Sequence, residues 1–281
     1  APRAVAAPAR RWLSGEPRRP NDLKGFTSLE DLFDFYQAFA KHVNDDVIAY
    51  DLGLFKRFLL FGKLVNYEEL RDIDWEEFLR GASQAYTTVN KIIQSRDFAV
   101  LAMKHVDSDA SDNLGLVQEV LGAAEAQSDE SYEALQGMVS GRVFDFMTRA
   151  IFHGVVVQRT FFELEDLDVG RCAIWDATCY TFVNKFEREM FFGAFRWAEP
   201  PENQYSPEQM EAFQEVREGD MEVWAKVDVK FAVSERMRTT TLGEDGEREE
   251  RSVDREFEST FTFLGCLKGP KPLEWRIVDI K

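Results

Sequence analysis

The first half of the chain repeats apolar residues at the three- and four-residue spacing of amphipathic helices. Capping-box spacings at Thr27/Glu30 and Asp74/Glu77 mark two of the helix starts. Each apolar face needs a covering layer. The predicted helices cover residues 29–43, 51–65, 74–106 with a break, 114–126 and 131–152, with a polar loop at 107–113.

The second half changes to the two-residue alternation of β-strands. Asp168-Val169-Gly170 has the composition of a tight turn and predicts a hairpin of residues 155–167 and 171–183. Further strands are predicted at 221–238, after the turn at 243–246, and at 275–280. Helices followed by a curved antiparallel sheet predict an α+β fold, with helices packed into the concave face of a cone.

These patterns divide the chain into three predicted segments, the last of which contains an insertion. Residues 1–21 hold five arginines, four prolines and a single acid, Glu16, which is typical of a mitochondrial or plastid targeting remnant. Arg11-Trp12-Leu13-Ser14 resembles a matrix processing pattern, and the alternative is a disordered basic tail. Residues 22–73 are predicted N-terminal amphipathic helices and residues 74–281 the cone domain, with an acidic insertion at 184–220 that carries a helix at 206–217.

The overall charge limits the possible partners. The chain has 34 Lys and Arg against 51 Asp and Glu, a formal charge of −17, so a phosphate backbone would repel it and we expect no direct nucleic acid partner. No phosphate-binding glycine motif is present, and the three histidines are too scattered to predict a metal site. We therefore expect no cofactor.

The three cysteines are too few for a disulfide framework and lack the spacing of a zinc site. Cys172 and Cys179 are seven residues apart, so on one regular strand they would point to opposite faces.

Residues 51–65 form a cationic and strongly apolar stretch in this acidic chain. Two interpretations are open: a core or subunit-contact helix whose basic side chains reach outward, or an interfacial helix lying on anionic lipid. The membrane or partner contacts predicted here are Lys56, Arg57, Phe58, Phe61 and Lys63.

Aromatic residues also gather in the predicted insertion, where a loop offers little core. Phe191, Phe192, Phe195 and Trp197 are therefore predicted partner contacts, because aromatic anchors dominate protein interfaces. The alternative is that they fold back onto the cone.

Several segments resemble the family of the peripheral subunit of the mitochondrial inner-membrane translocase (Tim-forty-four-like), which includes the mitoribosomal protein that tethers the large subunit to the membrane. The resemblance covers roughly residues 75–281. The similar segments are Ala134-Leu135-Gln136-Gly137-Met138-Val139-Ser140 to Ile151, Gln158 to Val169, Val227 to Glu235, the turn at Gly246, and Trp275-Arg276-Ile277-Val278-Asp279-Ile280.

The resemblance implies a nuclear transport factor two-like cone and binding at the matrix face of the inner membrane, with lipid contact through helices that precede the cone. Two features depart from the family. The ribosomal relatives touch RNA and are expected to be basic, whereas this chain is acidic, and the insertion at 184–220 is not a family feature.

Enzymes of the wider superfamily use acids or a His–Asp pair in the pocket for proton transfer. The candidates are His153, Asp176, Tyr180 and Glu187, but each also fits a structural role, such as His153 at a helix C-terminus. We predict no catalytic residues. An acid pair in the pocket would favour an enzyme, and a pocket filled by Phe and Trp would favour a scaffold.

These patterns predict a non-catalytic accessory or scaffold subunit of a large mitochondrial inner-membrane assembly, such as a respiratory complex or ATP synthase, bound peripherally on the matrix side. Its partners would be other protein subunits, with anionic lipid as a further contact. The alternatives are a translocase or mitoribosome membrane tether, and a small-molecule enzyme or lipid carrier that uses the cone pocket.

Overall fold

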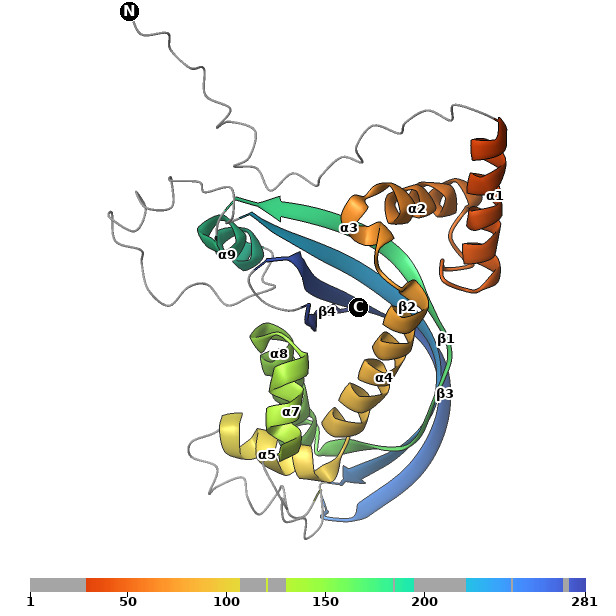
Figure 1. The fold of residues 1–281 in the computed structure, drawn as a ribbon. Helices are drawn as coiled ribbons and strands as arrows, with labels where there is room; N and C mark the ends of the chain where they lie inside the picture. The colour runs from red at the N-terminus through yellow and green to blue at the C-terminus, as the bar shows by residue number, and fades with distance from the viewer. Residues whose placement is uncertain are drawn as a thin grey trace, which may run out of the picture.

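The computed structural model describes residues 29–106, 120, 130–183, 185–194, 221–243, 245–269 and 273–281 (Figure 1). Helices precede a four-stranded antiparallel sheet of order β1-β2-β3-β4, which confirms the predicted α+β fold. The helices are α1 (Leu29–Asn44), α2 (Leu54–Asn66), α3 (Glu68–Arg71), α4 (Trp75–Ile93), α5 (Arg96–Val106), α7 (Glu130–Met138), α8 (Gly141–Phe152), the π-helix η1 (His153–Val157) and α9 (Lys185–Ala194). The strands are β1 (Thr160–Phe182), β2 (Glu222–Leu242), β3 (Arg248–Lys268) and β4 (Trp275–Ile280).

The sheet curves around the helices α4, α5, α7 and α8 (Figure 1). Its first strand pairs with β2 along nearly its whole length but shifts register at three places, Leu164/Asp166, Val169/Arg171 and Ile174/Asp176. Each shift is a β-bulge, which adds a residue to one strand and bends it. The bulges therefore supply part of the curvature that encloses the helices.

The predicted hairpin of residues 155–167 and 171–183 is wrong. Residues His153–Val157 form a π-helix, and β1 is one continuous strand. Gly170 is the extra residue of the second bulge, not part of a turn. Glycine in a strand pattern fits a bulge as well as a turn, and only the long-range pairing with β2 decides between them.

The predicted continuous helix over 131–152 is interrupted at Val139 and Ser140. Val139 forms an isolated parallel bridge with Ile277 of β4, and the Ser140 N–H donates to the Ile277 carbonyl at 2.8 Å. The Ser140 hydroxyl then accepts from the Val143 N–H at 3.4 Å and caps α8. A tertiary contact with the sheet thus overrides the helical periodicity.

The inner face of the sheet carries the main core. The ring of Tyr86 on α4 stacks on Phe231 at 4.5 Å and tilts against Phe261 at 4.7 Å, measured between ring centroids. Phe78, two turns earlier, meets Phe263 at 5.7 Å. The side chains that the helical spacing of α4 places on one face therefore fill the concave side of the sheet.

The outer face carries a smaller cluster of Phe182, Phe192, Leu264 and Val278, which α9 covers. This helix lies at the start of the predicted insertion and was not predicted. Outside the described residues lie residues 1–21, Thr27, the predicted loop at 107–113, nearly all of the predicted helix at 114–126, and the predicted helix at 206–217.

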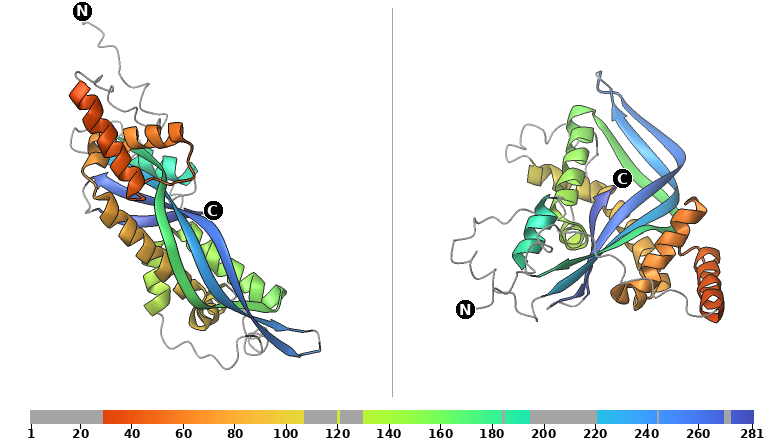
Figure 2. Two further views of the ribbon diagram at one scale, coloured as in Figure 1. Left: turned by 90° about the vertical axis from the view of Figure 1, so that its right-hand side faces the viewer. Right: turned by 90° about the horizontal axis from the view of Figure 1, so that it is seen from above.

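Helices α1 and α2 form an N-terminal arm, defined here as residues 29–67. The arm lies at the opposite end of the molecule from the turn between β2 and β3 (Figure 2). It joins the sheet at the free edge of β1, where the Ile174 N–H donates to Val47 O at 2.8 Å and the Ala49 N–H donates to Ile174 O at 3.0 Å. The arm is therefore attached through backbone pairing at one strand edge.

Strand β4 is short and covers only the end of β3. It pairs with Phe261–Gly265, and Lys281 adds two backbone hydrogen bonds with Thr260. Among the described residues, no strand pairs with the outer edge of β3 before Thr260. No helix in this part of the chain is both long and apolar enough to cross a bilayer.

Candidate functional site

Helix α2 has apolar residues on two opposite faces. Leu60, Phe61 and Leu64 are buried, and Phe61 is fully enclosed. On the other side, Leu54 and Phe55 are 73% and 74% exposed, and Phe58 and Leu59 are 44% and 50% exposed. The spacing of these four exposed residues places them on one face, which we name the α2 outer face.

The buried side of α2 packs against α1 through aromatic rings. The Phe61 ring meets Phe35 at 4.9 Å, Phe39 at 5.5 Å and the His42 ring at 5.0 Å. Phe58 touches the same helix at its margin, at 5.4 Å from Phe35. One apolar face is thus used for folding, and the second is largely exposed within the described part of the chain. A helix that folding alone required would be polar on its solvent side.

The five residues predicted as contacts in α2 have different roles. Phe58 belongs to the α2 outer face and Lys56 is exposed beside it. Phe61 is a core residue and is not available to a partner. Lys63 donates to an Asp176 carboxylate oxygen on β1 at 2.7 Å, and Arg57 Nε donates to the Leu52 carbonyl at 2.7 Å.

The sequence prediction missed Leu54, Phe55 and Leu59, which are as exposed as Phe58 or more so. The sequence does contain a signal for them. The apolar residues of α2 cover more of the helix circumference than one core-facing stripe needs, so some of them must be exposed.

Polar contacts hold the arm against the outer face of the sheet. Lys230 on β2 is ion-paired with Asp51, and with Glu258 at 2.7 Å. The Arg171 guanidinium lies 4.7 Å from the centre of the Tyr50 ring, a cation–π contact. Together with the Lys63–Asp176 pair, these contacts join the arm to β1 and β2.

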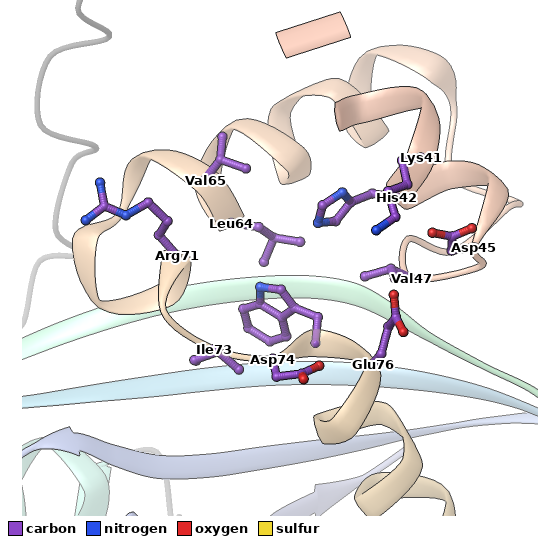
Figure 3. A pocket seen from close by; sticks show the side chains of 11 residues that line it. Lys41, His42, Asp45, Val47, Leu64, Val65, Arg71, Ile73, Asp74 and Glu76 are labelled. Carbon is purple, nitrogen blue, oxygen red and sulfur yellow. The ribbon is translucent and has the colours of Figure 1, made fainter. Parts of the chain in front are cut away.

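A hollow of about 270 Å³ separates the arm from the start of α4 (Figure 3). Lys41 and Asp45 lie on one side of it, and Asp74 and Glu76 on the other. Both signs of charge are present, and Asp74 is engaged as the helix N-cap, accepting from the Glu77 N–H at 2.9 Å. The hollow shows that the arm does not pack continuously against the body of the protein.

The aromatic residues of the predicted insertion divide into two groups. Phe192 is buried on α9, with its ring 5.2 Å from Phe182 and 5.1 Å from Trp224, and Phe191 packs beside it against Tyr180 at 5.0 Å. These two residues fold back onto the sheet. The other two predicted contacts, Phe195 and Trp197, lie outside the described residues.

A buried ionic group fixes α9 in place. Arg188 Nη1 donates to both carboxylate oxygens of Glu222 at 2.6 and 2.9 Å, and Trp224 Nε1 donates to the same carboxylate at 2.8 Å. The Arg188 guanidinium also lies 5.4 Å from the centre of a Trp224 ring. This arrangement satisfies a buried charge and is structural.

The four residues considered for catalysis do not converge on one pocket. His153 is exposed at the start of η1, and the Asp176 carboxylate pairs with Lys63. Burial raises the pKa of Tyr180 to about 12, with further contributions from Asp176 and Asp228. Glu187 on α9 accepts from the Val183 N–H at 2.9 Å, and burial raises the pKa of its carboxyl group.

A cavity of about 480 Å³ lies between α4, α8 and the inner face of the sheet. Tyr86 and Asn90 of α4 and its C-cap residue Gln94 line it at four-residue intervals, so they form one polar row, and Gln158, Thr160 and Ser259 add further polar lining. The apolar lining comes from α8 and the strands. It includes Phe146, Ile151, Phe161, Phe162, Phe257 and Phe261.

A charged pair stands at one side of this cavity. Arg255 lines the cavity and is ion-paired with Glu235, whose side chain is completely buried. The second Glu235 carboxylate oxygen, Oε2, and the buried Gln94 Oε1 have no hydrogen-bond partner among the described residues. Burial and the Glu235 charge raise the pKa of Tyr86 to about 12, while hydrogen bonds to Ser259 and Asn90 oppose this shift.

Comparisons with known proteins add no assignment, because the sequence matches no protein-family model and no curated protein significantly. Within the described part of the chain, no three His, Cys, Asp or Glu side chains group closely enough to hold a metal ion. The α2 outer face and the cavity are therefore the two features from which function can be argued.

Proposed function

We propose that this chain is a non-catalytic accessory subunit that docks onto a protein partner through the α2 outer face. The observation that carries the proposal is the exposure of Leu54, Phe55, Phe58 and Leu59 on a helix whose opposite face already fills the core. Large exposed apolar patches on folded proteins mark interaction surfaces. An amphipathic helix commonly binds by laying such a face into an apolar groove.

Charge favours a protein groove over an anionic bilayer. Helix α2 is basic, but the arm as a whole holds four Lys or Arg against six Asp or Glu, and the entire chain carries −17. Interfacial helices that bind anionic lipid depend on a basic polar face, because the membrane surface repels negative charge. The acids around α2 weaken that attraction and leave apolar contact as the main contribution.

The proposed place of action is the matrix side of the mitochondrial inner membrane, as a peripheral subunit of a respiratory-chain complex or ATP synthase. The Arg-rich and acid-poor composition of residues 1–21 supports the mitochondrial part of this proposal. The resemblance of residues 75–281 to a family that works at this membrane face supports the peripheral part. A translocase or mitoribosome tether is the alternative within the same class.

The test combines complexome profiling with substitutions on α2. Mitochondria that express the chain are solubilised in mild detergent, separated on a native gel and analysed by mass spectrometry. The intact chain is expected to migrate with a megadalton complex. The double variant Phe55→Glu with Leu59→Glu is expected to migrate near the chain's own mass of 32.4 kDa, because it places charge on the contact face.

Leu273→Glu is the matched control, because Leu273 is also 50% exposed but lies just before β4, away from α2. It should leave co-migration unchanged, and both variants should keep the melting temperature of the intact chain. Migration of the intact chain near its own mass would overturn the subunit proposal. Co-migration of the double variant would overturn the assignment to the α2 outer face.

A further inference from the structure

We propose that the cavity between α4, α8 and the sheet binds a neutral, long-chain amphiphile whose head group is a hydroxyl. This inference is independent of docking through α2, because the two features use different residues. The volume of about 480 Å³ falls within the range of about 300–1,000 Å³ that is usual for small-molecule sites.

The lining separates an apolar part from a polar part, as an amphiphile requires. Phe161, Phe257 and Phe261 of the sheet and Ile151 of α8 offer surface to a hydrocarbon chain. The polar row of α4 and the Ser259 hydroxyl of β3 also line the cavity and offer hydrogen bonds. A chain with one polar end satisfies both parts at once.

The charges in and around the cavity argue against an ionic head group. Arg255 is the one charged residue among the described lining, and its guanidinium is already paired with the buried Glu235. An anion would compete with Glu235 for Arg255. A cation would reach Glu235 only after displacing Arg255, and either change leaves a buried charge without its partner, which is strongly unfavourable.

One unpartnered atom indicates the hydrogen-bonding character of the head group. Gln94 lines the cavity, and its Oε1 is a buried acceptor without a partner among the described residues. Buried polar atoms are normally paired, so a hydrogen-bond donor is the complementary group. A hydroxyl donates to an acceptor and also accepts from a donor, so it suits either orientation of the Gln94 amide.

The entrance has the apolar character expected for a ligand taken from a hydrophobic source. Phe146 on α8 and Phe162 on β1 both line the cavity, yet they are 68% and 45% exposed. Exposed aromatic rings at a cavity rim are unfavourable in water unless something covers them. The hydrocarbon end of the ligand would lie against these rings.

Binding is tested on the purified full chain with Nile red, a neutral fluorescent probe for apolar sites, and three competitors of equal chain length: decanol, decanoate and decylammonium. We expect the probe to bind and decanol to displace it at a concentration about tenfold lower than either ion. Preferred displacement by decanoate or by decylammonium would overturn the neutral head group, and absence of probe binding would overturn the site.

Two variants test whether the probe binds in the cavity. Ala150→Trp adds a large side chain to the exposed part of the lining and is expected to abolish probe binding. Ala134→Trp is the matched control, since Ala134 is an exposed alanine on α7 that does not line the cavity, and it should bind the probe normally. Equal probe binding in both variants would show that the probe binds elsewhere and would overturn the site.

Gln94→Leu tests the head group without filling the cavity. It is expected to retain Nile red and to raise the decanol concentration needed for displacement about five- to tenfold, while decanoate changes little. Unchanged decanol displacement would exclude Gln94 from recognition. The variant Phe55→Glu with Leu59→Glu should behave as the intact chain, so failure of this proposal and failure of the docking proposal are separate results.

Discussion

At the residue scale, Gly170 illustrates how a strand bends without turning. Its φ is not positive, and an added Cβ would lie 3.7 Å from the Ala232 carbonyl oxygen, an ordinary contact. We therefore expect Gly170→Ala to change the free energy of unfolding by less than about 1 kcal/mol. Deletion of Gly170 should cost more, about 1–3 kcal/mol, because Val169 and Arg171 keep their partners Val233 and Ala232 but β1 loses the bend that the bulge supplies.

Urea unfolding of both variants measures this difference. A large loss of stability in Gly170→Ala would instead indicate a backbone conformation that only glycine adopts, as the predicted tight turn would have required.

Ionisation of Tyr86 should lower the stability of the folded chain at alkaline pH. Its pKa in the folded chain is raised from 10.0 to about 12, so the folded state disfavours ionisation. The stabilisation is fully present below pH 10 and is lost as the pH rises towards 12. Between those values, the free energy of unfolding of the intact chain should fall by about 2 kcal/mol more than that of Tyr86→Phe.

Chemical denaturation at pH 8, 10 and 11.5 provides the comparison, and Tyr180→Phe is a useful second variant because burial also raises the pKa of Tyr180 to about 12. Parallel pH curves for the intact chain and Tyr86→Phe would contradict the prediction.

Cys172 and Cys179 show why residue-level rules failed on β1. Their spacing of seven predicts opposite faces, yet Cys172 lies across from Phe231 and Cys179 across from Ala225, two residues of one face of β2. The bulge at Ile174/Asp176 reverses the alternation between them. Trp175, the extra residue, is an ordinary strand residue, so no local signal distinguishes it. All three cysteines are free thiols.

At the element scale, Gly62 on α2 links stability to the proposed docking. It follows the exposed residues of α2 by one turn, and an added Cβ would meet only Asn66 Nδ2 at 3.8 Å. Gly62→Ala should stabilise the chain by about 0.5–1 kcal/mol, because glycine is a poor helix former. The partner's approach to α2 should be hindered, so we expect weaker co-migration on native gels.

Gly137→Ala on α7 is the matched control, since an added Cβ there meets nothing within 4 Å. It should stabilise the helix without affecting co-migration. Equal co-migration of both variants would show that Gly62 does not lie in the interface.

The apolar periodicity predicted the bounds of helices that bury one face. It failed where a contact with a distant segment of the chain determines the local structure. Helices α1, α2 and α4 begin and end within three residues of their predicted positions, apart from the break before α5. The interruption at Val139 depends on Ile277, 138 residues later in the chain. The sequence predicted only a cone pocket. The residues that line the cavity come from α4, α8 and the strands, and no local pattern shows that these distant segments meet.

At the scale of the whole molecule, the attachment of the arm should depend on salt. Three of its contacts with the sheet are ionic or cation–π, and the Lys63 and Asp176 side chains are 33% and 41% exposed. In 1 M NaCl the screening length falls to about 3 Å, which weakens such pairs. Amide hydrogen exchange in residues 45–67 is expected to become about three- to tenfold faster, while α4 changes little.

Lys63→Met provides the control, because it removes one ionic contact and should leave a smaller response to salt. Exchange in the arm that stays constant with salt would show that its ionic contacts contribute little beside the backbone pairing with Ile174 and the apolar contacts of α2.

The uncovered edge of β3 also bears on the behaviour of the protein at high concentration. An unpaired strand edge is a template on which a second molecule can add its own strand, the first step of fibril growth. Eight of the twelve residues 248–259 are charged, with both signs interspersed, and a foreign strand would have to bury them. The long β2–β3 hairpin can therefore form a wall of the cavity and still resist self-association. The charged residues along its open edge make polymerisation unfavourable.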